Sequence, residues 1–383
     1  MNEFVCICPC HFGLEAVLKR EIANLGYEVL KTEDGKVSFA CDASGIARAN
    51  VFLRTAERVL IRTGSFEART FDELFEKTKA LPWEAFIPED GRVWVAKANS
   101  VKSALFSPSD IQSIMKKAIV ERLKAAYHTE TVPETGNAYP LRVTLMKDLV
   151  TIALDSSGES LHKRGYRTDS VKAPISETLA AALLDLTPWK KDRILVDPFC
   201  GSGTFLIEAA MKACRMAPGM NREFTAEKWT NFIPKRAWYD AVNEAAEQID
   251  RDVSCDLQGY DIDPRAIRSA RENAARAGVE HLIHFQVRDV RDLSHPKKYG
   301  FILTNPPYGE RIAEKEELPE LYRTLGERFR ALDSWSMYLI TSFDKCEEMI
   351  GRKANKNRKI YNGMLKTYFY TFSGPRPPKG KQP

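Results

Sequence analysis

The sequence predicts an α/β protein in which two small α+β modules precede a doubly wound, mostly parallel sheet. At 383 residues the chain is too long for one average domain. Apolar residues make up 44% and charged residues 28% of the chain, which is ordinary for a globular protein and argues against wholesale disorder. In the second half, buried strands alternate with helices, which is the pattern of a parallel sheet covered on both faces.

The first 66 residues predict one small α+β module. The helix in this region carries its apolar side chains on a single stripe, and the hairpin has Asp34-Gly35 at its turn. The expected elements are, in order, a strand at 4–8, a helix at 13–25, a hairpin at 27–41, a helix at 43–53 and a strand at 57–66.

Residues 67–160 predict a second α+β module. Its clearest element is a long amphipathic helix, which Ser109 can cap and whose polar face carries Lys116 and Lys117. The Gly- and Pro-containing basic stretch at 161–174 reads as a linker. The expected elements of the module are a helix at 71–81, a strand at 93–98, a helix at 109–127 and a hairpin formed by 141–146 and 149–154.

Residues 175–383 carry the strand–helix alternation. Because ligands of such sheets lie at the carboxyl ends of the strands, the residues that follow each strand are the candidates for a site. The expected elements are helices at 175–186, 204–214 and 264–277, and strands that end near 197, 261, 289, 304 and 341.

The first of these strands ends in a glycine-rich turn, Asp197-Pro-Phe-Cys-Gly-Ser-Gly-Thr204. Glycines at a strand-to-helix turn let the backbone approach a ligand and leave helix N–H groups free to bind it. Taken alone, the turn fits a dinucleotide, an adenosyl cofactor or a plain tight turn. It is not a P-loop, because no Gly-Lys-Ser/Thr follows.

Acidic residues end the next two strands. A carboxylate in this position can accept both hydroxyls of a ribose. Asp263 directly precedes Pro264 and suits a helix N-cap, so the ribose is assigned to Asp261. Asp289 ends the following strand and could accept an adenine amine. The series therefore indicates a nucleoside cofactor.

The turn Thr304-Asn-Pro-Pro-Tyr-Gly309 carries the most specific chemistry. The Asn305 side-chain oxygen and the Pro306 carbonyl can accept both hydrogens of an exocyclic aromatic amine, which localises the nitrogen lone pair for attack on a sulfonium methyl. Pro306 and Pro307 fix the turn, and Tyr308 can stack an extruded base. Such a transfer depends on positioning and electrostatics and needs no covalent intermediate.

The order DPFCGSGT, GYDIDP, RD and TNPPYG resembles class I S-adenosylmethionine (SAM)-dependent amino-methyltransferases of the N-P-P-Y type, over about 175–372. The segments KSALFSPSDIQSIMKKAIVERL, LRVTLMKDLVTIALDSSGESLHKRGYR and APISETLAAALL resemble a THUMP domain joined to its methyltransferase. The whole chain resembles bacterial THUMP-domain RNA methyltransferases that form N2-methylguanine in 23S rRNA, proteins often labelled N6-adenine-specific DNA methylases.

The resemblance implies a ferredoxin-like module at 1–66, an RNA-binding THUMP domain at 67–160, a basic linker at 161–174 and a Rossmann-like, SAM-dependent methyltransferase domain at 175–383. It implies that Asn305, Pro306, Pro307 and Tyr308 hold the target amine. The implied cofactor-binding residues are Asp197, Phe199, Gly201, Gly203, Thr204, Asp261, Asp289 and Asn305. The insert at 215–256, with Trp229 and Trp238, is expected to be a helical cover near the cofactor.

The net charge of +5 is concentrated at the end of the chain. Nine basic and no acidic residues lie between Gly351 and Pro383, so the rest sums to 5 − 9 = −4. This fits contact with a polyanion, with a solubilising tail as the alternative. Contact with RNA phosphates is expected of Lys116, Lys117, Lys163, Arg164, Arg167, Lys172, Arg358 and Lys359, with a solvated helix face as the alternative for the helix lysines.

Several functions stay open. An N6-adenine DNA or RNA methyltransferase would share the cofactor motifs, although nothing in the first half resembles a helix-turn-helix or other base-reading module of DNA-binding proteins. A cytosine-C5 enzyme would need a nucleophilic cysteine in the target loop, which TNPPYG lacks. A tRNA guanine-N2 methyltransferase and a non-enzymatic RNA-binding protein remain alternatives. The sequence does not determine the target nucleotide.

The eight scattered cysteines predict free thiols. Cys6, Cys8 and Cys10, followed by His11, share one face of a strand. Zinc sites favour C-x2-C pairs, so buried thiols are preferred and no metal is expected. The chain has no apolar run of the ~18 residues that a membrane span needs, and its start lacks a signal-peptide pattern. We expect a cytoplasmic protein without membrane contact, and a monomer, although the sequence does not fix the oligomeric state.

Overall fold

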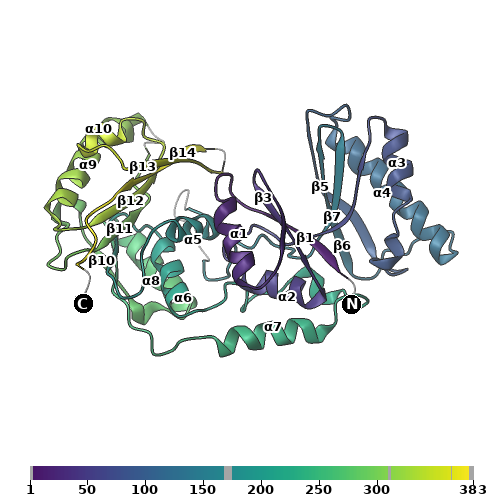
Figure 1. Cartoon of the computed structure of the whole chain (residues 1–383), viewed down its shortest axis with the longest axis horizontal. Helices are drawn as coiled ribbons and strands as arrows, with labels where there is room; N and C mark the ends of the chain where they lie inside the picture. The colour runs from purple at the N-terminus through teal and green to yellow at the C-terminus, as the bar shows by residue number, and fades with distance from the viewer. Residues whose placement is uncertain (1–2, 168–174, 309–311, 364, 379–383) are drawn as a thin grey trace. The chain divides into compact units, whose positions relative to one another are not determined.

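The computed structural model describes residues 3–167, 175–308, 312–363 and 365–378, and the chain forms two compact units (Figure 1). Each unit is discontinuous in sequence. The first unit contains Met1–Cys10, Lys19–Leu161 and Arg222–Glu244. The second contains His11–Leu18, His162–Asn221 and Ala245–Pro383. The chain therefore passes five times between the units.

The first unit is built on a seven-stranded sheet with the order β2-β3-β1-β4-β7-β6-β5. Strand β4 joins the two predicted modules, because it pairs briefly with β1 and along its length with β7. The two α+β modules expected from the sequence thus share one sheet. Its strands are β1 (Phe4–Pro9), β2 (Val29–Glu33), β3 (Lys36–Cys41), β4 (Leu60–Glu67), β5 (Arg92–Val101), β6 (Ala138–Met146) and β7 (Leu149–Asp155).

Helices α2 (Ala43–Phe52), α3 (Phe71–Lys79) and α4 (Pro108–Tyr127) lie in the first unit, and α1 (Glu15–Asn24) crosses into it from the second. The cap of α4 differs from the prediction. Ser107, and not Ser109, accepts a hydrogen bond from the backbone N–H of Asp110. Pro108 occupies the first helical position, where its fixed φ starts the helix one residue before the predicted range of 109–127.

The insert between the two cofactor motifs contributes no residue to the lining of the strand-end cavity of the second unit. Its segment Arg222–Glu244 packs within the first unit. Trp229 is fully buried and stacks on Tyr139 of β6, with ring centroids 5.2 Å apart and planes 12° apart. The Trp229 indole also donates to the carbonyl of Ala138 at 2.8 Å. Helix α7 (Lys235–Glu247) follows and crosses back to the second unit.

The second unit contains a seven-stranded sheet with the order β10-β9-β8-β11-β12-β14-β13. The first five strands in this order are parallel, whereas β14 pairs antiparallel with β12 and with β13. A C-terminal hairpin therefore completes the doubly wound sheet. The strands are β8 (Leu195–Asp197), β9 (Leu257–Asp261), β10 (Ile283–Val287), β11 (Phe301–Thr304), β12 (Ser336–Thr341), β13 (Lys356–Asn362) and β14 (Leu365–Phe372).

Helices cover both faces of this sheet (Figure 1). Leu195 and Val196 are neighbours on β8 but belong to different hydrophobic cores, since successive strand side chains point to opposite faces. One core includes side chains of α5 (Glu177–Asp185), α6 (Thr204–Ala213) and α8 (Pro264–Arg276). The other includes α9 (Ile312–Ala331) and α10 (Cys346–Ile350). The predicted fold class, a Rossmann-like domain preceded by small α+β modules, is confirmed.

The cysteines are free, and Cys6, Cys8 and Cys10 are buried. The Sγ atoms of Cys6 and Cys41 lie 3.5 Å apart, and their hydrogen bond together with burial raises the pKa of the Cys6 thiol well above its usual value. Within the described ranges, no group of three or more His, Cys, Asp or Glu side chains is placed to hold a metal ion. The described helices include none long and apolar enough to cross a membrane.

Candidate active site

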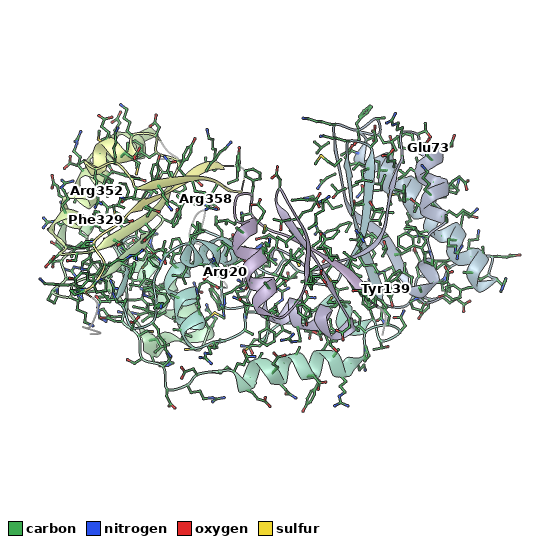
Figure 2. All side chains as sticks on the ribbon, viewed as in Figure 1. Arg20, Glu73, Tyr139, Phe329, Arg352 and Arg358 are labelled. Carbon is green, nitrogen blue, oxygen red and sulfur yellow. The ribbon has the colours of Figure 1, made fainter. Side chains whose placement is uncertain are left out.

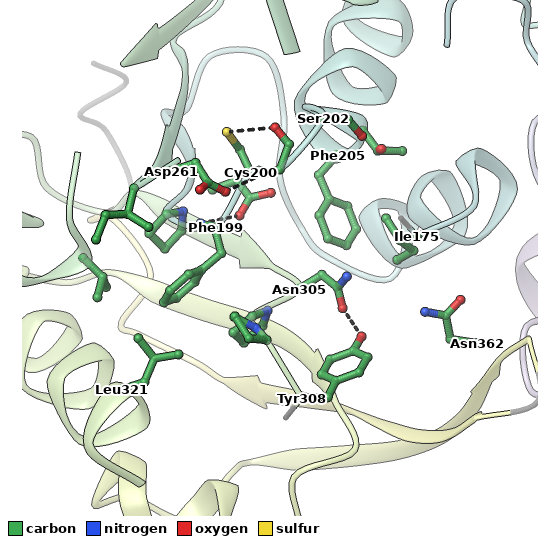
Figure 3. A pocket seen from close by; sticks show the side chains of 18 of the residues that line it. Ile175, Phe199, Cys200, Ser202, Phe205, Asp261, Asn305, Tyr308, Leu321 and Asn362 are labelled. Carbon is green, nitrogen blue, oxygen red and sulfur yellow. Dashed lines mark hydrogen bonds between the residues drawn. The ribbon is translucent and has the colours of Figure 1, made fainter. Parts of the chain in front are cut away.

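The second unit contains a cavity of about 570 Å³ at the carboxyl ends of its parallel strands (Figure 3). The strand-end motifs predicted from the sequence converge here, because parallel strands all end at the same edge of the sheet. The predicted site residues that line the cavity are Asp197, Phe199, Gly201, Thr204, Asp261, Asp289, Asn305, Pro306, Pro307 and Tyr308.

Gly203 was predicted to line the cofactor site, but it does not line the cavity. It caps α6 with a φ of +84°, a conformation that favours glycine. A Cβ atom at this position would lie 2.9 Å from the Phe285 ring and 3.1 Å from the Ala270 Cβ. Close packing beneath the turn and the positive φ therefore both require glycine at this position.

Asp197 ends β8 and is only 2% exposed. Its Oδ1 accepts hydrogen bonds from the Thr304 hydroxyl at 2.6 Å and from the backbone N–H of Phe199 at 3.1 Å. Burial nevertheless dominates over these bonds and raises the pKa of Asp197 to about 7, with a further contribution from nearby Asp261. In the described part of the chain, no cation pairs with this carboxyl group, so it favours a ligand that brings positive charge.

Asp261 ends β9 and holds the glycine-rich turn in place. It accepts the backbone N–H of Gly201 at 3.0 Å and that of Asp263 at 2.9 Å. Burial is the main cause that raises the pKa of Asp261. Asp263 accepts the backbone N–H of Arg265 at 2.8 Å and caps α8, so the predicted capping role is confirmed. Of the two carboxylates Asp261 and Asp263, it is Asp261 that lines the cavity.

Asp289 lines the cavity from the loop that follows β10. It accepts the backbone N–H of Arg291 at 2.8 Å and the Arg291 guanidinium at 2.7 Å. These bonds hold the pKa of Asp289 below its usual value. The group is therefore an anion at neutral pH and can accept hydrogen bonds from a ligand.

The Asn-Pro-Pro-Tyr turn follows β11 and forms the opposite part of the lining. The Tyr308 hydroxyl donates to Asn305 Oδ1, as the dashed line in Figure 3 shows. The buried Tyr322 of α9 lies with its hydroxyl 3.3 Å from the Pro307 carbonyl and 2.6 Å from Thr341 Oγ1. Tyr322 thus contacts the turn on its buried side, and no local sequence motif predicts this contact.

Sequence reasoning missed part of the lining. Asn362 and Leu365 enter from the β13–β14 hairpin, Leu321 from α9, and Ile175 from the residues just before α5. None of them belongs to a recognisable motif. They reach the cavity only because the hairpin and the helices pack against the strands that carry the motifs.

The predicted RNA contacts of Arg164 and Arg167 do not fit the structure. Arg164 is 4% exposed, and its Nε lies 3.4 Å from Oε1 of the fully buried Glu208. Arg167 donates to Thr204 Oγ1 at 2.5 Å and to the Ile175 carbonyl at 3.2 Å, and it pairs with Glu177 at 3.7 Å. Buried carboxylates, Glu208 of α6 and Glu177 of α5, hold these two guanidinium groups in the protein interior.

The other predicted RNA-contacting residues lie at the surface. In the first unit, Lys117 is exposed and Lys116 pairs with Glu134 at 3.0 Å. In the second unit Lys163, Arg358 and Lys359 are exposed, and Figure 2 shows Arg358 on the C-terminal hairpin. Lys172, Gly309 and half of the predicted linker (168–174) fall outside the described residues.

Comparison with known proteins is consistent with this geometry. Three family models match the chain: the RlmL ferredoxin-like domain at residues 5–60, the THUMP domain at 68–155 and the RMKL-like methyltransferase domain at 164–370. A Bacillus subtilis protein named "Putative RNA methyltransferase YpsC" is 48% identical, over 100% of this chain and 99% of its own. The ribosomal RNA large subunit methyltransferase K/L of Hahella chejuensis is 34% identical over 98% of this chain, which spans about half (54%) of that protein.

Solved structures agree in fold. "A possible methylase" from Clostridium difficile 630 superposes with a TM-score of 0.96, at 51% identity over 99% of this chain and 100% of its own. SMU.472, described as "a putative methyltransferase complexed with SAH" (S-adenosylhomocysteine), has a TM-score of 0.93 and 41% identity over 99% of this chain and 100% of its own.

The fold and its strand-end site define a class I SAM-dependent methyltransferase, as predicted. Within that class, the chain belongs to the RMKL-like family of THUMP-domain RNA methyltransferases.

Proposed function

We propose that this protein transfers the methyl group of SAM to the N2 amine of a guanine in 23S rRNA. One observation carries the proposal. The Asn-Pro-Pro-Tyr turn, suited to an exocyclic amine, lines the same cavity as Asp197, Asp261 and Asp289, which are suited to a cationic nucleoside cofactor. A methyl donor and an amine acceptor can therefore meet in one enclosed space.

The cavity residues fit SAM. Asp197 is a buried carboxylate without a cationic partner among the described residues, and it would bind the amino group of the methionine part. Asp261 would accept the ribose hydroxyls and Asp289 the adenine amine. Gly201 has open space around its Cα, so the turn leaves room for a ligand. Bound SAM supplies an electrophilic methyl group on a sulfonium.

The protein's own contribution is to aim the target amine. Asn305 Oδ1 and the Pro306 carbonyl would accept the two amine hydrogens, which directs the nitrogen lone pair toward the methyl group. The Tyr308 hydroxyl, which donates to Asn305 in this structure, must then give way to the amine. The lone pair forms the new N–C bond, the C–S electron pair stays with sulfur, and one amine hydrogen leaves as a proton to solvent.

RNA as the substrate is supported by the THUMP domain and by the printed names of the relatives. Guanine N2 and 23S rRNA come from the family resemblance, while the K/L relatives are named for the large subunit RNA and are about twice as long as this chain. The proposal includes domain boundaries at residues 66, 160 and 174. It also includes a cytoplasmic location, where ribosomal RNA is found, and contacts between the exposed lysines and RNA phosphates.

The N6 amine of adenine is the second candidate. A solved Listeria monocytogenes structure with 47% identity and a TM-score of 0.93 is described as "a predicted N6-adenine-specific DNA methylase". Both amines are exocyclic, and the Asn-Pro-Pro-Tyr turn can hold either. The first unit, which matches a THUMP domain, favours RNA over DNA.

Mass mapping of modified nucleosides tests the proposal. We expect a deletion strain to lose N2-methylguanine at one site of 23S rRNA and to regain it with the wild-type gene but not with Asn305→Ala. The Asn305→Ala protein should still bind RNA. Asn221→Ala, an exposed asparagine of the same unit outside the cavity, is the matched control and should restore the mark. Loss of N6-methyladenine alone, or full activity of Asn305→Ala, would refute the proposal.

A further inference from the structure

The C-terminal hairpin forms a wall of the active-site cavity. Strand β13 pairs antiparallel with β14, with Asn362 opposite Leu365 at the turn, and both residues line the cavity together with Gly363. These residues lie more than fifty positions after the Asn-Pro-Pro-Tyr turn. The hairpin therefore adds side chains to the site that none of the cofactor or amine motifs contains.

Asn362 lines the cavity on the side of Asn305 that is away from Phe199. In Figure 3, Asn305 and Tyr308 lie between Phe199 and Leu321 on one side and Asn362 on the other. Phe199 belongs to the cofactor turn, so the space between Asn305 and Asn362 is left for the substrate. The Asn362 side chain is partly buried, and within the described residues its amide has no hydrogen-bond partner. Such a group needs a ligand or water to satisfy it.

We propose that Asn362 reads the Watson–Crick edge of the target base and selects guanine, an inference that rests on the proposed function. With the N2 amine held by Asn305 and Pro306, the rest of that edge presents the N1–H donor and the O6 acceptor. A carboxamide offers one acceptor and two donors, so Asn362 can make both bonds at once. Adenine held by its N6 amine presents only the N1 acceptor beside it, and one of the two bonds is lost.

The neighbouring residues complete a pocket for a planar base. Leu365 is 39% exposed and, with Ile175, gives the lining an apolar component, while Tyr308 offers an aromatic face. Beyond the turn, the hairpin carries exposed Lys359 and Lys366, whose ammonium groups lie 5.1 and 5.3 Å from the Tyr361 and Tyr368 rings. Cations and rings together are typical of surfaces that hold single-stranded nucleic acid. An extruded nucleotide would thus have its base at Asn362 and its backbone beside the hairpin lysines.

Base substitution in the substrate tests the reading role directly. The probe is a synthetic RNA stem-loop with the site mapped in 23S rRNA, carrying either guanine or 2-aminopurine at the target position. 2-Aminopurine keeps the exocyclic 2-amine but lacks O6 and the N1–H. We expect Asn362→Ala to lower kcat/KM on the guanine RNA by roughly 10- to 100-fold, the range of one bidentate base contact. Its kcat/KM on the 2-aminopurine RNA should fall much less, because N1 of that base can accept only one of the two bonds.

Matched measurements separate the possible outcomes. Asn357→Ala, an exposed asparagine on the same strand outside the cavity, should keep the preference for guanine, and the affinity of Asn362→Ala for SAH should equal that of the wild type. Equal losses on both RNAs would assign Asn362 a structural role and overturn the proposal, as would an unchanged guanine preference. A wild-type enzyme inactive on the guanine RNA would instead overturn the proposed function itself, and the base reading with it.

Discussion

Replacing Asp197 with Asn is expected to stabilise the protein more at pH 8 than at pH 5. Asp197 is 2% exposed, and burial is the main cause that raises its pKa from an ordinary value of 3.8 to about 7. Both of its hydrogen bonds, from Thr304 and from Phe199, end on Oδ1. An asparagine keeps that oxygen, so the substitution removes the ionisation and leaves both bonds in place.

The sign follows from proton linkage. Between pH 3.8 and about 7 the folded protein retains a proton on Asp197 that the unfolded chain has lost, so the free energy of unfolding falls as pH rises. At ~1.4 kcal/mol per unit of pKa, the full effect is about 4 kcal/mol, of which roughly 2–3 kcal/mol develops between pH 5 and pH 8. Well below pH 3.8 the carboxyl group is neutral in both states, and the difference between the variant and the wild type should no longer depend on pH.

Thermal unfolding of the cofactor-free protein is a suitable assay. For a chain of 383 residues, the melting temperature of Asp197→Asn relative to the wild type should rise by roughly 2–4 °C between pH 5 and pH 8. The control is Asp263→Asn: Arg265 holds the pKa of Asp263 below its usual value, so this group is ionised in the folded and unfolded states at both pH values, and its melting-temperature difference should not change between pH 5 and pH 8. A melting-temperature difference for Asp197→Asn that is the same at both pH values would refute the reasoning from burial.

Three further predictions concern two buried contacts and one pair of exposed lysines. Glu208→Gln removes a carboxylate that pairs with the buried Arg164 and should lower the free energy of unfolding by about 3–5 kcal/mol; a near-neutral result would show that the pair is dispensable. Trp229→Ala should cost about 3–5 kcal/mol and expose the 222–244 segment to protease, and resistance to cleavage would contradict its anchoring role. Replacing Lys359 and Lys366 with Gln should reduce the slope of log K against log salt for single-stranded RNA by about 1.4, whereas an unchanged slope would remove both from the interface.

The motif part of the site could be predicted because it follows from two local facts. Asp197 and Asp261 end their strands, Asp289 and Asn305 come within two residues after theirs, and parallel strands end at one edge of their sheet. Neither fact depends on knowing which distant segments pack together. The expectation that these residues share one cavity could therefore be formed from the sequence.

The roles of the basic residues could not be predicted in this way. Arg164 and Lys163 are neighbours in a basic stretch, yet one is buried on Glu208 and the other is exposed. The charge of a side chain says nothing of whether a carboxylate from another helix lies beside it. The same holds for Trp229, whose partner Tyr139 is ninety positions away in sequence.

The sequence by itself determined the chemistry that the strand ends carry and the order in which they occur, and hence the class of the enzyme. Only the tertiary structure decided which polar groups are desolvated and which additional side chains reach the cavity. Asn362 is an example, since its position depends on β14 pairing antiparallel with β12. The physical reason is that burial and strand pairing arise between residues far apart in the chain, whereas a motif is read from neighbours.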